Sequence, residues 1–142
     1  NPDLRSGWKI RLEQGTGEKN LAPAVTFSGA ISFNTYLPAA RSTTEAQTCG
    51  PTEGKGLRYV LSLKDGTAVN NFNLLDDGNG SDHLEANSAA DRFESLRSSG
   101  IPGQSVFIST AYGVKEIPPD NTPRDAAGTN RFQTFWQRLQ KP

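Results

Sequence analysis

The chain has 142 residues, of which 15 are basic and 15 acidic, so its formal net charge at pH 7 is zero. This balance excludes the strong excess of positive charge that nucleic-acid-binding domains use to attract phosphates. Only 34% of the residues are hydrophobic, whereas the chain has 14 glycines and nine prolines. The length and composition therefore predict one domain with a modest core and many turns and loops.

The sequence contains no methionine and begins Asn-Pro-Asp, which predicts a processed chain or a fragment of a longer protein. It contains a single cysteine, Cys49. In a secreted protein an odd cysteine indicates a partner outside the fragment or a free thiol. An inert loop cysteine is the alternative.

Alternation of apolar and polar residues predicts several β-strands in the first half of the chain. The segments with this pattern are Gly7–Leu12, Ala24–Phe27, Ala30–Tyr36, Tyr59–Leu63 and Ala68–Phe72. Ser28–Gly29 and Asp65–Gly66 are typical of two-residue hairpin turns, because glycine adopts positive φ easily. The last four segments are therefore expected to form a four-stranded antiparallel meander from about Ala22 to Leu74.

The segment Leu37–Gly56 has no apolar period and is rich in glycine, threonine and proline. It is expected to be an inserted surface loop, and loops of this length are usually functional or mobile. Because recognition is commonly placed on loops held by a rigid sheet, it is the candidate contact surface. The side chains considered for contacts are Arg41, Glu45, Lys55 and Arg58. A variable, solvated insertion is the alternative.

The second half of the chain mixes a helix signal with two strands. Asp82 and Glu85 have the spacing of a capping box, which predicts a short helix at about His83–Ser98. Gln104–Thr110 and Val114–Ile117 are expected to pair as a hairpin. A loop is expected from Pro118 to Asn130, followed by an apolar, aromatic segment at Arg131–Leu139.

Several segments, taken in order, resemble the C-terminal propeller of the PilY1/PilC family of type IV pilus proteins. They read GWKIRL, GEKNLAPAVTFSGAISFNTYLP, GLRYVLSLKDG, SSGIPGQSVFIS and RFQTFWQRL. The resemblance implies a mainly β region, 1–142, made of antiparallel four-stranded propeller-type blades. Ala22–Leu74 would be a complete blade, with Gly7–Leu12 and Gln104–Leu139 belonging to its neighbours. A propeller needs at least about four blades, so the ring would be incomplete.

The same resemblance implies a non-enzymatic role in type IV pilus assembly, twitching motility and surface adhesion, as a protein associated with the pilus tip. The expected location is extracellular, at the pilus tip or outer membrane of a bacterium. The expected partners are minor pilins or other parts of the same protein, with a host or surface receptor as ligand and no nucleic acid. Two alternatives remain, namely a fragment of a quinoprotein-like propeller enzyme and an unrelated β-sandwich binding module.

No catalytic, cofactor or metal site is predicted from the residues. His83, beside Asp82, is expected to be a solvated residue of the first helical turn, and no serine lies in a GxSxG motif. The one metal alternative is calcium at the acidic loop, since calcium binds converging oxygen ligands. The loop oxygens come from Asp76, Asp77, Asn79 and Asp82. The EF-hand pattern fails there, because glycine and glutamate are missing at positions six and twelve, so a solvated acidic turn is expected.

Overall fold

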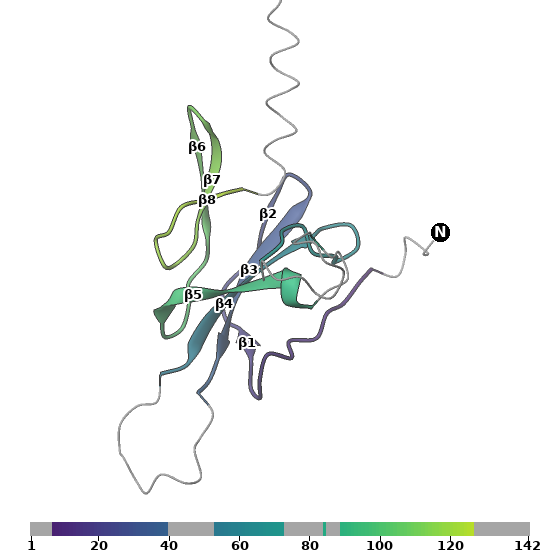
Figure 1. Cartoon of the computed structure of the whole chain (residues 1–142), viewed down its shortest axis with the longest axis vertical. Helices are drawn as coiled ribbons and strands as arrows, with labels where there is room; N and C mark the ends of the chain where they lie inside the picture. The colour runs from purple at the N-terminus through teal and green to yellow at the C-terminus, as the bar shows by residue number, and fades with distance from the viewer. Residues whose placement is uncertain (1–6, 40–52, 73–83, 85–88, 127–142) are drawn as a thin grey trace, which may run out of the picture.

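The computed structural model describes residues 7–39, 53–72, 84 and 89–126, which form two antiparallel sheets (Figure 1). Sheet A contains β1 (Lys19–Asn20), β2 (Val25–Phe27), β3 (Ala30–Leu37), β4 (Lys55–Ser62) and β5 (Phe93–Ser99). Sheet B contains β6 (Val106–Thr110), β7 (Gly113–Ile117) and β8 (Arg124–Asp125). A 3-10 turn, η1 (Ala90–Arg92), precedes β5. The prediction of a mainly β chain is confirmed.

Sheet A is a meander in which β2, β3, β4 and β5 are neighbours, and β1 shares with β2 the same edge of β3. The predicted hairpin between β2 and β3 is confirmed. Ser28 and Gly29 both have positive φ, 49° and 81°, which matches the twist of the two strands. Phe27 therefore pairs with Ala30 across the turn.

The strands β3 and β4 form the centre of sheet A and pair along their full length, from Ala30–Ser62 to Leu37–Lys55. The strand β4 begins four residues earlier than the predicted strand, because Lys55 and Gly56 continue the ladder opposite β3. The connection is therefore shorter than the predicted loop Leu37–Gly56, because Leu37 belongs to β3 and Lys55 and Gly56 belong to β4. Its residues 40–52 lie outside the described part of the chain.

The apolar core lies on one face of sheet A. Four buried side chains form it, namely Phe33, Leu57, Tyr59 and Leu61. They come from alternate positions of β3 and β4, which place them on the same face. The Phe33 and Tyr59 rings stack with centroids 5.1 Å apart, and Phe93 of β5 lies 5.6 Å from the Tyr59 ring.

The predicted strand Gly7–Leu12 is wrong in one respect, because this segment joins no ladder within the described residues. Its alternation is nevertheless visible, since Trp8, Ile10 and Leu12 are half-buried and their neighbours are exposed. These three side chains pack against the core of sheet A. The segment covers the face of the sheet instead of extending its edge, so period-two burial arises without pairing.

Trp8 anchors this covering segment to the turn after β4. Its indole N–H donates to the Leu63 carbonyl at 2.9 Å. The indole also lies against Gly66, where an added Cβ would come within 2.6 Å of the Trp8 ring. Glycine is thus required at Gly66 both for its φ of 70° and for contact with the ring.

Gly66→Ala is expected to lower the free energy of unfolding by more than Gly29→Ala, its matched control. Both glycines have positive φ, so alanine costs about 1–2 kcal/mol at either position. Only at Gly66 does the added methyl group meet the Trp8 ring, and such overpacking costs about 1–3 kcal/mol more. Urea unfolding of the two variants measures the difference. Equal losses would show that Trp8 does not lie against Gly66.

The predicted fourth strand at Ala68–Phe72 is wrong, because only a single bridge, Leu61–Ala68, forms there. Asn70 and Asn71 are poor strand formers. Phe72 lies over the Arg58 guanidinium, with the ring centroid 5.5 Å from Cζ, and so covers a face of the sheet. The strand β5 takes the fourth position beside β4 instead.

The predicted helix His83–Ser98 is wrong over its second half, which forms η1 and β5. Phe93 pairs with Tyr59 and Glu94 with Arg58, so side chains alternate between the two faces of the sheet. The serines of this segment are weak helix formers, and pairing with β4 outweighs their local preference. Residues 83 and 85–88 of the predicted helix lie outside the described part.

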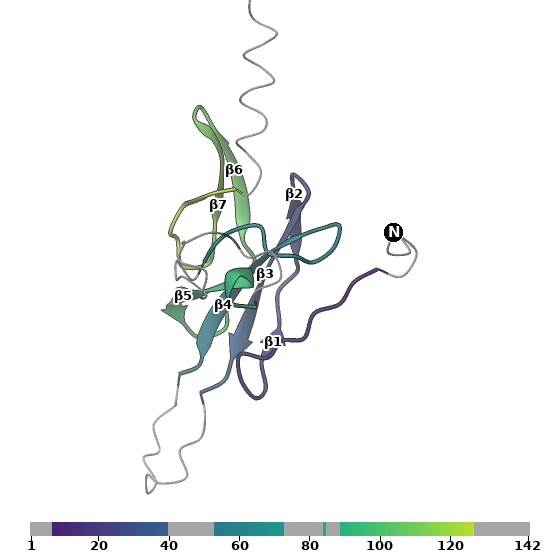
Figure 2. The same ribbon diagram turned by 45° about the vertical axis from the view of Figure 1, so that its right-hand side comes forward.

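Sheet B contains the predicted hairpin, with β6 and β7 paired from Val106–Ile117 to Thr110–Gly113. Figures 1 and 2 show this hairpin projecting beyond the body of sheet A. Phe107 faces sheet A and stacks on Phe27 with centroids 5.1 Å apart, whereas Val106 and Ile108 face solvent. The predicted loop after Pro118 contains the short strand β8, which pairs with β7.

Candidate functional site

A surface pocket lies at the end of the central hairpin, where β3 ends and β4 begins. Its volume is about 380 Å³, which falls in the range of small-ligand sites. The lining residues are Gln14, Gly15, Thr16, Leu37, Pro38, Ala39, Glu53 and Lys55. The pocket therefore flanks both ends of the connection that the sequence indicated as a contact surface.

Glu18 holds the turn that forms one wall of the pocket. Its Oε1 accepts hydrogen bonds from the Thr35 hydroxyl at 2.7 Å and the Tyr59 hydroxyl at 2.8 Å. Its Oε2 accepts from the Gln14 backbone N–H at 3.0 Å. Burial, together with the hydrogen bond and negative charge of Glu18, raises the pKa of Tyr59 well above its usual value. Tyr59 therefore stays protonated and keeps donating to this carboxylate.

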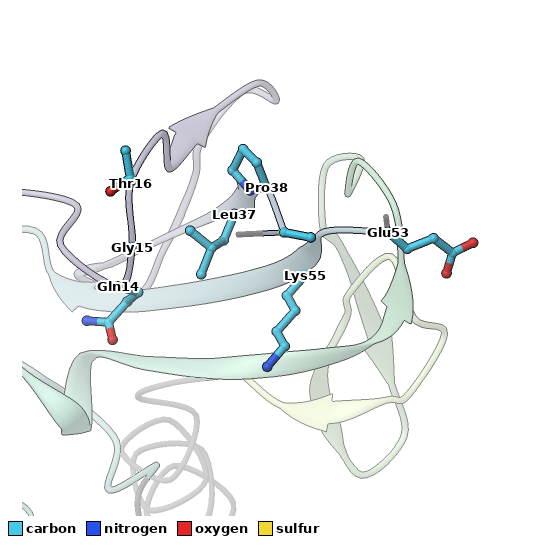
Figure 3. A pocket seen from close by; sticks show the side chains of 8 residues that line it. Gln14, Gly15, Thr16, Leu37, Pro38, Glu53 and Lys55 are labelled. Carbon is cyan, nitrogen blue, oxygen red and sulfur yellow. The ribbon is translucent and has the colours of Figure 1, made fainter. Parts of the chain in front are cut away.

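The polar groups of the pocket do not converge on one point. Figure 3 shows the head groups of Gln14, Glu53 and Lys55 pointing in different directions around the apolar side chain of Leu37. Acid–base catalysis requires titratable groups within hydrogen-bond reach of one another or of a common substrate atom. The described lining residues suit binding through an apolar floor and a polar rim.

The second polar feature is a group of four charged side chains between the two sheets, called here the charge quartet. Arg58 of β4 and Glu94 of β5 are opposite one another in sheet A. Glu116 of β7 and Arg124 of β8 are opposite one another in sheet B. The two cross-strand pairs face each other, so positive and negative charges alternate around the quartet.

Arg58 makes the central contacts of the quartet. Its Nε donates to Glu116 Oε1 at 3.0 Å, and Nη2 contacts Oε2 of the same carboxylate. Its Nη1 donates to Glu94 Oε1 at 2.5 Å. The Arg58 and Glu116 side chains are each 1% exposed. Glu116 thus binds Arg58 through two nitrogens and Glu94 binds the third, which is the kind of pairing that a buried arginine needs.

The remaining contacts extend the network through sheet B. The Ser32 hydroxyl donates to Glu116 Oε1 at 2.6 Å. Arg124 contacts Glu94 at 2.8 Å and Asp120 at 3.2 Å. Both carboxylate oxygens of Glu116, in sheet B, accept hydrogen bonds from residues of sheet A. The quartet therefore holds the two sheets together.

Two carboxyl groups of this network have lowered pKa values. Burial alone raises the pKa of Glu116, but hydrogen bonds from Arg58, its positive charge and the hydroxyls of Ser32 and Ser105 together lower it. For Asp120, burial is likewise outweighed, chiefly by hydrogen bonds from Arg124 and Thr122, so its pKa lies well below the usual value. Both groups are ionised in the folded protein at neutral pH.

Stability is therefore expected to fall on acidification. A carboxyl group with a lower pKa in the folded state binds fewer protons there than in the unfolded chain. Its contribution is fully present above the unfolded values of 4.5 for Glu116 and 3.8 for Asp120, and decreases from these values down through the lower pKa of the folded state. Urea unfolding at pH 7, 5, 4 and 3 measures this loss. Glu116→Gln should weaken the pH dependence, and an equal dependence in both proteins would contradict the assignment.

Of the four side chains that the sequence offered for contacts, the structure describes Lys55 and Arg58, and these two lie in different environments. Lys55 lies at the pocket rim, and its role as a contact residue stays a prediction. Arg58 does not, since it is buried in the charge quartet and cannot meet a ligand. Arg41, Glu45 and Cys49 lie outside the described residues.

The acidic loop considered for calcium, with Asp76, Asp77, Asn79 and Asp82, also lies outside the described residues, as does His83. In the part of the chain that the structure describes, no three His, Cys, Asp or Glu side chains are grouped as metal ligands. The calcium alternative at that loop stays an untested hypothesis.

The pocket floor and the charge quartet were both missed at the level of sequence. The sequence offers one hint for Arg58, because it is a charged residue in the middle of an apolar strand, between Leu57 and Tyr59. A charged residue at such a position usually faces water, but here sheet B and Phe72 cover it. No local pattern indicates that Glu116 would be its partner, 58 residues away.

The described segments contain no helix that is both long enough and apolar enough to cross a bilayer. No protein-family model matches the chain, and comparisons with curated proteins and with solved structures return no match either.

Proposed function

We propose that the chain is a non-enzymatic part of a bacterial, type IV pilus-associated surface protein built from β-propeller-type blades. In this role it supports pilus assembly or presents an adhesive surface at the pilus tip. The partners are minor pilins or other parts of the same protein, and a host or surface receptor.

The observation that carries this proposal is the meander β2–β3–β4–β5. A propeller blade is a four-stranded antiparallel sheet, and this strand order has that form. The proposed blade differs from the one expected at Ala22–Leu74, because its outer strand is β5. The ordered resemblance of GWKIRL through GLRYVLSLKDG to the pilus family supports the same interpretation.

The pocket supports the proposal of an adhesive surface near the ends of β3 and β4. It lies at one end of the rigid central hairpin, where binding residues are commonly placed. Lys55 and Glu53 are exposed at its rim, and Leu37 provides apolar contact area. Such a mixed surface fits a polar ligand with an apolar part, such as a peptide or a sugar.

Deletion of the encoding gene in the source bacterium tests the proposal. Loss of surface pili or of attachment to cultured epithelial cells, with recovery on re-expression, is the expected result. Unchanged pili, twitching motility and attachment would contradict it.

Two matched variants separate assembly from adhesion. Lys55→Glu changes the pocket rim, whereas Lys64→Glu changes an exposed lysine in the turn at the other end of β4. Lys55→Glu should reduce attachment and leave the number of pili intact, and Lys64→Glu should change neither. Equal attachment by both variants would remove the pocket from the adhesive surface.

A further inference from the structure

The outer edge of β6 differs from the other sheet edges in the described part of the chain. Within those residues β6 pairs with β7 alone. Natural proteins protect such edges with charges, proline, bulges or very short strands. The strand β5 carries Glu94 and Arg97 and has an irregular register with β4, and β1, β2 and β8 have two or three residues each.

None of these protections is present on β6. It has five residues, Val106–Thr110, without charge, proline or irregular pairing. No charged side chain occurs between Arg97 and Lys115. Val106 is 57% exposed and Ile108 is 47% exposed, although β-branched apolar residues usually pack on a neighbour. The edge thus has both open backbone groups and exposed apolar side chains.

The inner side of the same hairpin is firmly held. Phe107 stacks on Phe27, and Glu116 is fixed by Arg58 in the charge quartet. The free edge is therefore presented by a rigid element, so little conformational entropy is lost when another strand pairs with it.

We propose that β6 pairs antiparallel with β6 of a second copy of this chain, about a twofold axis at Ile108. In this register Val106 lies opposite Thr110 of the partner, Phe107 opposite Ser109, and Ile108 opposite Ile108. The β-branched pairs stabilise one face, and no like charges meet, as self-pairing requires. The two copies of sheet B become one continuous six-stranded sheet. This association is independent of the pilus-related role proposed above.

Sedimentation velocity of the full chain tests the pairing from about 10 µM to about 1 mM, the range where weak association is measurable. The average mass should rise from 15.3 kDa toward twice that value. Ile108→Lys should keep the chain at 15.3 kDa, since two lysines would face each other at the axis. Ile101→Lys is the matched control at an exposed position outside the strand, and should dimerise like the unchanged protein.

Disulfide crosslinking tests whether the proposed twofold axis lies at Ile108. Across an antiparallel pair the two Ile108 Cα atoms would lie about 4.5–5.5 Å apart, within the range that a disulfide spans. In a Cys49→Ser background, Ile108→Cys should form a covalent dimer on mild oxidation, and Ile101→Cys should not. A monomer at all concentrations, a dimer that survives Ile108→Lys, equal crosslinking at both positions, or open-ended aggregation would each overturn the proposal.

Discussion

Arg58→Ala is expected to lower the free energy of unfolding by about 3–5 kcal/mol, because it leaves Glu116 buried without its cation. The alanine also leaves Glu94 without one of its two arginine partners and removes the group beneath Phe72. Urea unfolding monitored by tryptophan fluorescence measures the loss.

The matched control for this prediction is Arg11→Ala. The Arg11 side chain is 86% exposed and lies 3.9 Å from Glu13, so its removal should change stability by no more than about 0.5 kcal/mol. Arg58→Met combined with Glu116→Leu should recover much of the stability, since an apolar pair avoids the desolvation of two charges. If Arg58→Ala behaves like Arg11→Ala, the quartet does not join the sheets.

Leu61→Ala is expected to cost about 2–5 kcal/mol, because a buried leucine loses both its burial energy and its packing neighbours. Leu61 is 0% exposed and lies in the core with Phe33, Leu57 and Tyr59. Trp8 and its covering segment pack against the same core. This packing limits how far neighbouring side chains can move into the cavity that the alanine leaves.

Leu63→Ala makes the same chemical change two residues further along the chain. Leu63 is 48% exposed, so its side chain contributes little burial and the expected loss is about 0.5 kcal/mol or less. Parallel urea unfolding curves give both values. Equal costs would mean that the two leucines have similar environments and that the core is misplaced.

The parts of the fold that depend on neighbouring residues could be predicted from the sequence. The β2–β3 hairpin follows from Ser28–Gly29, where local turn geometry decides the register. Alternation alone predicts the β6–β7 hairpin, but it does not predict which face of the hairpin turns toward sheet A. Phe107 turns toward Phe27, a contact 80 residues away in sequence, so Val106 and Ile108 turn outward.

The errors occurred where a distant partner decided the conformation. Phe93 and Leu96 are three residues apart, as on one face of a helix, yet this segment pairs with β4 as a strand. Gly7–Leu12 has the alternation of a strand but lies on a face, because the core of sheet A needs a cover. Both outcomes depend on tertiary packing, which overrides local preference.

The candidate site was predictable in location but not in composition. The connection between β3 and β4 was identified from its polar, aperiodic sequence, and the pocket lies at its two ends. The wall formed by Gln14 and Thr16 depends on Glu18 reaching across to Thr35 and Tyr59. These hydrogen bonds join three separate segments, so no local pattern indicates them.

The docking of sheet B on sheet A through the charge quartet is tested most directly by hydrogen exchange on the unchanged protein and Glu116→Gln. Losing one charged partner costs about 1.5–3 kcal/mol, which corresponds to roughly ten- to hundredfold faster exchange. This increase is expected in the β6–β7 amides, with a smaller change in β3 and β4. Unchanged protection of β6–β7 in Glu116→Gln would contradict the account.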